Sequence, residues 1–526
     1  MSNSKSSKIQ EIARTLESIS NIINEGKYQE ALNAFSLLEK ENPKNKTIEF
    51  NKLALLVDAG YGLRDPKLVQ EGLEVGEKCL KRDEYKKYQA DIHYNLGNGY
   101  LSLFTLSERN RGIEGIPQSE NLQKAKSHLR KATKSADDFD LKKQLWVNYG
   151  NCLDTLGRGV EAFDAYNRAL EIDPNFPMAV GNKAQALCFF ADICGEYSGA
   201  MYLQAYQDIN SIIENQDLTK FGGVRAKQSF ERQLKKIESV FKDKRHLSKR
   251  LRHRKYNSTK LSDFEKFYLD FCITERLFLN FHIHEGQCEA AIRDPIFISL
   301  ITDIEDDESF YRLAKHINEI KEDYAIARLL LAQSQYKRKD FDSISRRTTF
   351  ANTLDYSQFN LYYGLLKSSF KEAYNILDKV SVFINDYYKL GLKENSIYFK
   401  TIWQKDTRIR DEILNSKNIS LYALYDIHQD FRCGYYHNIT DIRHALTHRK
   451  IVFFDLPPEG ANKKNDKCNI YYETMLKETI NLMRLVRSAI IYLVNFVNIE
   501  ENKKRKKSKG LIMPMYVDTS QFLESF

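Results

Sequence analysis

A spaced pattern of glycine, alanine and aromatic residues in residues 146–174 is the strongest constraint on how this 526-residue chain can fold. The small residues Gly150 and Ala162 allow the two helices of one hairpin to approach closely, and Pro174 then ends the second helix. The same register recurs between Gly26 and Pro43. The pattern therefore predicts stacked helical hairpins. Its members in residues 146–174 are Trp146, Tyr149, Gly150, Leu153, Gly157, Ala162, Tyr166, Ala169, Leu170 and Pro174.

This spacing resembles that of tetratricopeptide repeats (TPRs). A further copy is visible where HYNLGNGYL, residues 93–101, aligns with WVNYGNCLD, residues 146–154. Its second helix resumes at Ala125, after an insertion that we expect to form a surface loop near residues 105–121. The array is expected to occupy residues 1–215. The resemblance implies a superhelix whose concave face binds a protein or peptide, and the alternative is a rigid spacer or dimerisation arm.

Basic charge is concentrated in two stretches, although the net charge of the whole chain is only +9. Residues 220–255 hold 14 lysines and arginines against three acidic residues, a net of +11, and residues 503–509 (KKRKKSK) add +6. This distribution fits a polyanionic partner, and the alternative is a solvated helix face with a connector. We expect a basic helical linker over residues 216–260 and a basic tail over residues 501–526. The linker residues assigned to weak RNA contacts are Lys249, Arg250, Arg252 and Arg254.

From residue 261 onward, long amphipathic patterns replace the short repeat. Residues 357–390 keep apolar residues at three- and four-residue spacing throughout, and residues 471–497 form a second long helical pattern. Shorter helices are predicted over residues 418–431 and from residue 439 into the segment that ends at residue 454. Two long helices with short ones between them predict an antiparallel helical bundle.

Within that half, residues 443–448 (RHALTH) combine an arginine with two histidines. His444 and His448 are four residues apart and share a helix face, whereas Arg443 lies roughly 140° from His448 around the helix axis. A planar guanidinium suits a phosphate, and an imidazole can act as a general base or acid near neutral pH. These are the requirements of metal-free RNA cleavage by the 2′-hydroxyl. Two motifs that meet across a two-fold axis would bring both groups to one phosphodiester, which predicts a homodimer or a higher homo-oligomer.

The arginine–x4–histidine pattern, its position before a long terminal helix and three other segments resemble the HEPN ribonucleases, in a subfamily commonly fused to TPRs. The resemblance implies an all-α chain with a HEPN domain over residues 261–500. It also implies a metal-independent endoribonuclease that leaves 2′,3′-cyclic phosphates, with Arg443, His448 and His444 as catalytic residues. His444 stands where that subfamily usually has asparagine. The three segments are YLDFCITERLFLN (268–280), YAIARLLL (324–331) and FKEAYNILDKVSVFINDYYKL (370–390).

The residues of the motif also have a structural interpretation. Arg443 could pair with Asp441 or Glu473, while His448 caps a helix or fills a polar position in the core. Some HEPN relatives are catalytically inert and act as antitoxins or scaffolds. The intact motif favours a ribonuclease over an inert relative.

Charged residues inside the predicted bundle helices are a second group of candidates. Arg328, and Asp378 with Lys379, could line the same cleft as Arg443, and we assign Arg328 and Lys379 as weak RNA contacts. The alternative is that each marks a solvated edge or forms an ion pair within the bundle.

Several other classes of function lack support in the sequence. His282, His284 and Cys288 form an H-x-H-x3-C cluster without a second pair nearby, so we expect no metal and no cofactor. The eight cysteines include no CxxC pair and the N-terminus has no apolar signal region, which predicts a cytoplasmic protein. The most apolar stretch, residues 488–497, is about half the length that spans a bilayer. No nucleotide-binding loop, H-E-x-x-H or G-x-S-x-G motif is present in the sequence.

The function that these features favour is a toxin or an anti-phage abortive-infection effector. In this hypothesis the repeats bind a partner or trigger, and the HEPN domain cleaves cellular RNA to halt growth. The principal rival is a non-catalytic adaptor, in which the bundle dimerises and the repeats recruit proteins.

Overall fold

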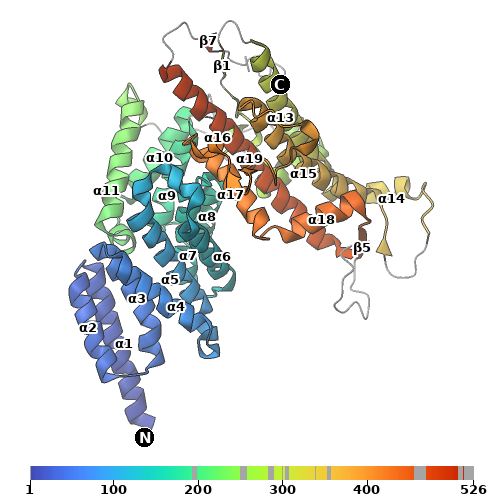
Figure 1. Cartoon of the computed structure of the whole chain (residues 1–526). Coiled ribbons are helices and arrows are strands. Elements are labelled where there is room, and N and C mark those ends of the chain that lie inside the picture. The colour runs from blue at the N-terminus through green and yellow to red at the C-terminus, as the bar shows by residue number, and fades with distance from the viewer. Residues whose placement is uncertain are drawn as a thin grey trace. The chain divides into compact units, whose positions relative to one another are not determined.

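The computed structural model divides into two compact units, each described here by itself (Figure 1). Unit 1 comprises Met1–Phe189 with Ala200–Arg250, and unit 2 comprises Phe190–Gly199 with Leu251–Phe526. Helices dominate both units, which confirms the all-α prediction. The structure describes residues 2–191, 193, 198–248, 258–281, 289–298, 300–302, 307–337, 339–351, 357–454, 469–507 and 513–514.

Unit 1 is built from helical hairpins, as the repeat pattern predicts. Successive helices pair within the hairpins α1–α2, α3–α4, α5–α6 and α7–α8, and the contacts α4–α5 and α6–α7 join one hairpin to the next. Several helices begin at a side-chain cap, such as Asn45 and Asp138, whose oxygens accept backbone N–H bonds of the first turn. The helices are α1 (Ser2–Asn24), α2 (Tyr28–Glu41), α3 (Lys46–Leu63), α4 (Pro66–Leu80), α5 (Gln89–Leu103), α6 (Glu120–Ser135), α7 (Phe139–Thr155), α8 (Gly159–Ile172), α9 (Pro177–Ala191), α10 (Ser198–Ile212) and α11 (Gln216–Val240).

The glycine and alanine positions of the repeat perform the packing role that the sequence predicts for them. A Cβ atom added at Gly150 would lie 2.4 Å from the ring of Tyr166, which faces it from α8. Ala162 and Ala169 on α8 are completely buried. The helix ends at Ile172, two residues before Pro174. Close helix approach within the hairpin therefore depends on the missing side chain at Gly150.

Two parts of unit 1 differ from the expectation. The insertion near residues 105–121 is a compact series of short helical turns between Phe104 and Gln118, and it leads into the Ser119 cap of α6. The helical part of the predicted linker, α11, belongs to unit 1. Its Phe230 is buried against Gly181 of α9, so close that a Cβ atom at Gly181 would lie 2.3 Å from the ring. The buried apolar face of α11 therefore packs on the repeats, and most of its basic residues face solvent.

Unit 2 is a helical bundle centred on the C-terminal helix α19. Contacts join α19 to α13, α15, α17 and α18, and α13 also packs along α15 (Figure 1). The helix is long and apolar enough to cross a membrane by length and composition alone, but 83% of its most apolar window is buried inside the protein. The helices of the unit are α12 (Asp263–Thr274), α13 (Asp307–Gln335), α14 (Lys339–Ser345), α15 (Leu361–Tyr387), α16 (Asp411–Leu414), α17 (Ile419–Arg432), α18 (His437–His448) and α19 (Tyr472–Lys507).

Short strands occupy two segments that the sequence predicted as helix, at the start of the 357–390 pattern and at the end of the segment that reaches residue 454. The predicted helix that begins near residue 439 stops at His448, and Val452–Phe454 forms strand β5. Strand β5 pairs antiparallel with β2 (Ser357–Gln358) and parallel with β6 (Asn469–Tyr471). Phe453 is fully buried, with its ring 4.7 Å from that of Tyr363. Side-chain burial therefore outweighs continuation of the helix. The remaining strand pairs are β1 (Ile301–Thr302) with β7 (Met513–Pro514) and β3 (Gln404–Lys405) with β4 (Arg408–Ile409).

Arg328, expected as a weak RNA contact, is instead a core residue of unit 2 and is 5% exposed. Its guanidinium makes two bonds to Asp294, of 2.7 and 3.1 Å, and donates to the Leu277 carbonyl at 3.2 Å and the Tyr268 hydroxyl at 2.8 Å. Burial by itself would raise the pKa of Asp294, but the charge and hydrogen bonds of Arg328 hold that pKa below its usual value. The prediction for Arg328 is wrong because all of its donor groups face the core.

Lys379 also forms ion pairs, but at the edge of the bundle. Its ammonium lies 2.5 Å from carboxylate oxygens of both Glu319 and Asp323 on α13, and its side chain is 35% exposed. The ion-pair alternative therefore describes Lys379 in this structure, and these partners turn it toward α13.

Replacing Gly150 by alanine should destabilise unit 1. Because the added methyl group overlaps the Tyr166 ring, we expect a loss of roughly 1–3 kcal/mol in the free energy of unfolding. Gly364, an exposed glycine in α15 with nothing within 4 Å of an added Cβ, is the matched control. Gly364→Ala should stabilise unit 2 by about 0.5–1 kcal/mol. Thermal unfolding followed by circular dichroism measures both, and equal shifts in the two variants would contradict the packing argument.

Removing the Arg328 side chain should destabilise unit 2 far more than removing that of Lys379. Arg328→Ala leaves Asp294 without its cation in a buried position, which costs about 3–5 kcal/mol. Lys379→Ala breaks a half-exposed pair and should cost no more than about 1 kcal/mol. Denaturant unfolding of both variants tests this, and similar midpoints would assign Arg328 a surface role.

Candidate functional site

Helix α18 presents the RHALTH motif from the surface of unit 2. The chain leaves α17 through a tight turn in which Gly434 has a φ of +79°, a conformation that glycine adopts without strain. Ile439, Ile442 and Ala445 are buried, at a spacing of three residues, and fix the face of α18 that meets α15 and α19. This packing leaves the remaining faces of α18, with the motif's polar side chains, toward solvent.

Arg443 lies at the edge of the contact between α18 and α15. Its guanidinium carbon is 5.1 Å from the centre of the Tyr374 ring, and its Nη2 is 4.0 Å from Oδ2 of Asp378. The side chain is 32% exposed. Among the described residues its guanidinium donates no hydrogen bond, so its planar donors remain available to an anion. The partner of Arg443 is therefore Asp378, and neither Asp441 nor Glu473.

The surroundings of Asp378 explain why this ion pair is loose. Oδ1 of Asp378 accepts a hydrogen bond of 2.8 Å from the backbone N–H of Phe399. Burial raises the pKa of the carboxyl, and the opposing effects of this hydrogen bond and of Arg443 do not offset it. Burial also raises the pKa of the neighbouring Tyr374 hydroxyl to about 12. The carboxylate thus positions Arg443 without satisfying it.

His444 and His448 are both exposed and lie side by side, as the four-residue spacing predicts. Their ring centres are 5.1 Å apart, with the planes inclined at 56°. His448 is the last residue of α18. Neither ring makes a hydrogen bond to another described residue. Both imidazoles can therefore reach a ligand, while Arg443 on the same helix is turned toward α15.

The sequence identified only part of this constellation. Asp378 was a candidate for the same cleft, and it does face Arg443. Tyr374 was missed, although its i,i+4 spacing from Asp378 puts both residues on one face of α15. Lys400 was also missed, since it comes from the loop after α15 and its charge interacts with that of Arg443. Nothing in the sequence pattern indicates that Lys400 and Arg443 interact.

The other predicted residues are not brought to Arg443. Arg328 lies in the core and Lys379 pairs with α13. The four linker residues, Lys249 to Arg254, lie outside the described residues, as does the cluster of His282, His284 and Cys288. Over the part of the chain that the structure describes, no group of three or more histidine, cysteine, aspartate or glutamate side chains is arranged to hold a metal ion.

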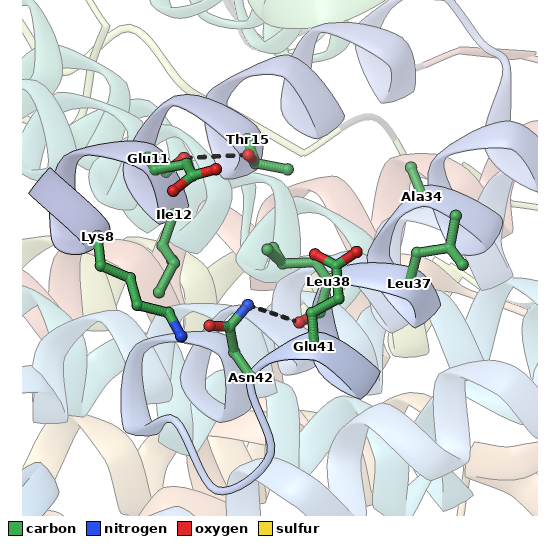
Figure 2. Close-up of a pocket in the computed structure, with 9 residues that line it drawn as sticks. All are labelled: Lys8, Glu11, Ile12, Thr15, Ala34, Leu37, Leu38, Glu41 and Asn42. Carbon is green, nitrogen blue, oxygen red and sulfur yellow. Dashed lines mark hydrogen bonds between the residues drawn. The ribbon is translucent and has the colours of Figure 1, made fainter.

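A pocket is present in unit 1, between α1 and α2 (Figure 2). It encloses about 210 Å³ and mixes apolar residues with charged ones at its rim. Its lining contains no histidine, cysteine or arginine, so it does not have the groups for phosphodiester chemistry. The lining residues are Lys8, Glu11, Ile12, Thr15, Ala34, Leu37, Leu38, Glu41 and Asn42.

Comparison with solved structures finds TPR proteins. The chain has neighbours in a thermophilic TPR protein of Thermus thermophilus and in the C-terminal part of a TPR repeat-containing protein from Cytophaga hutchinsonii. The first has 20% identity and a TM-score of 0.32, and the match covers 42% of this chain and 98% of that one. The second has 14% identity and a TM-score of 0.19, with 45% and 100% covered. No curated protein matches the chain.

The second half matches a protein family. Residues 304–500 match the LA2681-like HEPN family, and this range holds α13 to α18, most of α19 and the whole RHALTH motif. The resemblance inferred from the motif is thereby confirmed, within the expected range of residues 261–500. The repeat pattern and the packed hairpins of unit 1 precede this domain in the chain. The protein thus combines TPR-type helical hairpins with a HEPN domain, and residues 304–500 are similar to the LA2681-like HEPN family.

Proposed function

We propose that the HEPN domain is a metal-independent endoribonuclease whose active site includes Arg443, His444 and His448. The observation that carries the proposal is the exposure of both imidazoles on the helix that also holds an incompletely paired arginine. HEPN domains are commonly ribonucleases, which agrees with this chemistry. The guanidinium supplies parallel donors for the non-bridging oxygens of a phosphate.

The reaction that these groups support is transesterification within the RNA. An imidazole removes the proton of the 2′-hydroxyl, and the 2′-oxygen attacks the adjacent phosphorus. The bond from phosphorus to the 5′-oxygen breaks, and that oxygen takes a proton from an imidazolium. The products are a 2′,3′-cyclic phosphate and a 5′-hydroxyl end. Two neighbouring histidines supply the base and the acid, while Arg443 stabilises the charge on the phosphate oxygens.

A homodimer with facing motifs completes the proposal. Arg443 is directed toward Tyr374 and Asp378 of α15, whereas His448 projects from the end of α18. A site that takes its arginine from one subunit and its histidine from the other meets this geometry. Most apolar residues of α15 and α19 are buried within the unit, so they do not supply the interface of such a dimer.

The basic surface of α11 supports contact with RNA outside the active site. Arg232, Lys235 and Lys236 are exposed on this helix, while Leu218, Phe230 and Ile237 are buried. A row of cations of this kind attracts the phosphate backbone without reading its sequence.

The repeats are proposed to bind a protein partner or trigger, and the whole chain to act in the cytoplasm as a toxin or defence effector. The side chains of Asp58 on α3 and Asp154 on α7 are exposed, yet burial by the helices around them raises the pKa of each carboxyl to about 6. Neither has a cationic partner among the described residues, which favours a partner that brings positive charge. The rival function, a non-catalytic adaptor, predicts that overexpression is tolerated whether or not the motif is intact.

Substitution of the motif should remove RNA cleavage without unfolding the protein. Arg443→Ala and His448→Ala should each lower the cleavage rate at least about 100-fold, because each removes a transition-state interaction. EDTA should leave the wild-type rate unchanged. The assay is cleavage of total RNA, with 5′-hydroxyl ends mapped by sequencing. His437→Ala, at the exposed start of the same helix, is the control and should retain activity. Full cleavage by the His448→Ala protein would refute the proposed mechanism.

Mixed dimers test the composite site. When Arg443→Ala and His448→Ala subunits are coexpressed, a mixed dimer contains one complete site, so up to about a quarter of the wild-type activity should return. Coexpression of Arg443→Ala with the double variant cannot form a complete site and serves as the control. Dimers that regain no cleavage would show that one subunit supplies both residues. A monomer that cleaves at the full rate would exclude a dimeric site altogether.

A further inference from the structure

The loop that follows α15 is held firmly against that helix. Phe399 is 2% exposed and Trp403 is fully buried, and the Trp403 indole N–H donates to the Phe399 carbonyl at 2.6 Å. The backbone N–H of Phe399 donates to Oδ1 of Asp378 at 2.8 Å. Lys400 and Thr401 lie between these anchors and are exposed. The fold therefore fixes the backbone of Lys400 while it leaves the side chain toward solvent.

Asp378 connects this loop to Arg443. One oxygen of the carboxylate binds the residue before Lys400, and the other lies 4.0 Å from Nη2 of Arg443. Asp378 therefore contacts both Arg443 and the backbone next to Lys400. The pKa of Lys400 is lowered, first by burial and next by the charge of Arg443, against the opposite effects of Asp378 and Asp441. The direction agrees with two cations held close together.

The ammonium of Lys400 forms neither a hydrogen bond nor an ion pair with any of the described residues. One carboxylate cannot neutralise both cations, and the Arg443 guanidinium donates no hydrogen bond among the described residues. Like charges in proximity destabilise each other unless an anion lies between them. The arrangement therefore favours a bound anion with more than one negative group, such as successive phosphates of an RNA strand.

We propose that Lys400 is a second phosphate-binding residue of the Arg443 site and contacts the phosphate next to the one that Arg443 holds. This inference rests on the proposed ribonuclease function and extends it, since it assigns the site a strand with at least two consecutive phosphates. Lys400 acts in binding the substrate, and the proton transfers remain with the histidines.

Lys400→Gln tests the inference, with Lys405→Gln as a matched control. Lys405 is an exposed lysine on β3, five residues further along the chain, and it forms no ion pair with a described residue. With single-stranded RNA, Lys400→Gln should raise KM several-fold with little change in kcat. It should also lower the slope of log Kd against log salt concentration by about 0.7. Lys400→Arg should restore both values, and Lys405→Gln should match the wild type.

A dinucleotide substrate, which contains a single phosphodiester, provides the second measurement. The difference between Lys400→Gln and wild type should disappear on this substrate, because the second phosphate is missing. If Lys400→Gln matches Lys405→Gln in KM and in salt slope, while Arg443→Ala still abolishes cleavage, the assignment of Lys400 fails and the ribonuclease proposal stands. If the wild type neither binds nor cleaves RNA, both proposals fail together.

Discussion

Burial of α19 is the constraint on which the rest of unit 2 depends. An apolar run as dense as residues 488–497 must be covered on all sides, and α13, α15, α17 and α18 each contact this helix. The polar side chains of α19 are accommodated by specific bonds. Arg487 donates to the Phe278 carbonyl at 2.8 Å, and Asn495 donates to the Ser420 hydroxyl at 2.8 Å. These bonds specify the register of the surrounding segments as well as stabilising them. Because α18 is one of the helices that pack on α19, this packing sets the position of α18 and of the RHALTH motif that it carries.

Arg328 and Arg443 of unit 2 show how the environment of an arginine distinguishes a structural role from a ligand-binding one. Arg328 is surrounded by four well-formed donor–acceptor bonds, and its charge is matched by Asp294 at 2.7 Å. Arg443 has an aromatic ring on one side and a carboxylate oxygen at 4.0 Å on the other. The bonds of Arg328 leave its guanidinium unavailable to a ligand. Removing Arg328 would leave the buried charge of Asp294 without its partner. The contacts of Arg443 leave its guanidinium plane available. An arginine in a helical pattern cannot be assigned to either class until its donors have been traced.

The sequence predicted what depends on spacing within one helix or one hairpin. Gly150 opposite Tyr166 and the shared face of His444 and His448 are such features, because a helix places residues three or four apart on one side whatever surrounds it. The errors lie where tertiary burial outweighs the local pattern. Val452–Phe454 continues a helical periodicity, yet it forms a strand because Phe453 packs beside Tyr363. Residues 216–240 have a linker's charge, but the burial of Phe230 attaches them to the repeats.

Asp378 illustrates why long-range constellations escape prediction from one sequence. Its two oxygens have different partners, one on the loop at Phe399 and one on α18 at Arg443, and these lie far apart from each other in the chain. The same carboxylate therefore builds the loop and restrains the arginine. Burial raises the pKa of this carboxyl, and its 4.0 Å contact with Arg443 is too long for a hydrogen bond. In the proposed function, a phosphate would replace the long 4.0 Å contact of Arg443, while the 2.8 Å backbone bond to the other oxygen would keep the loop in place.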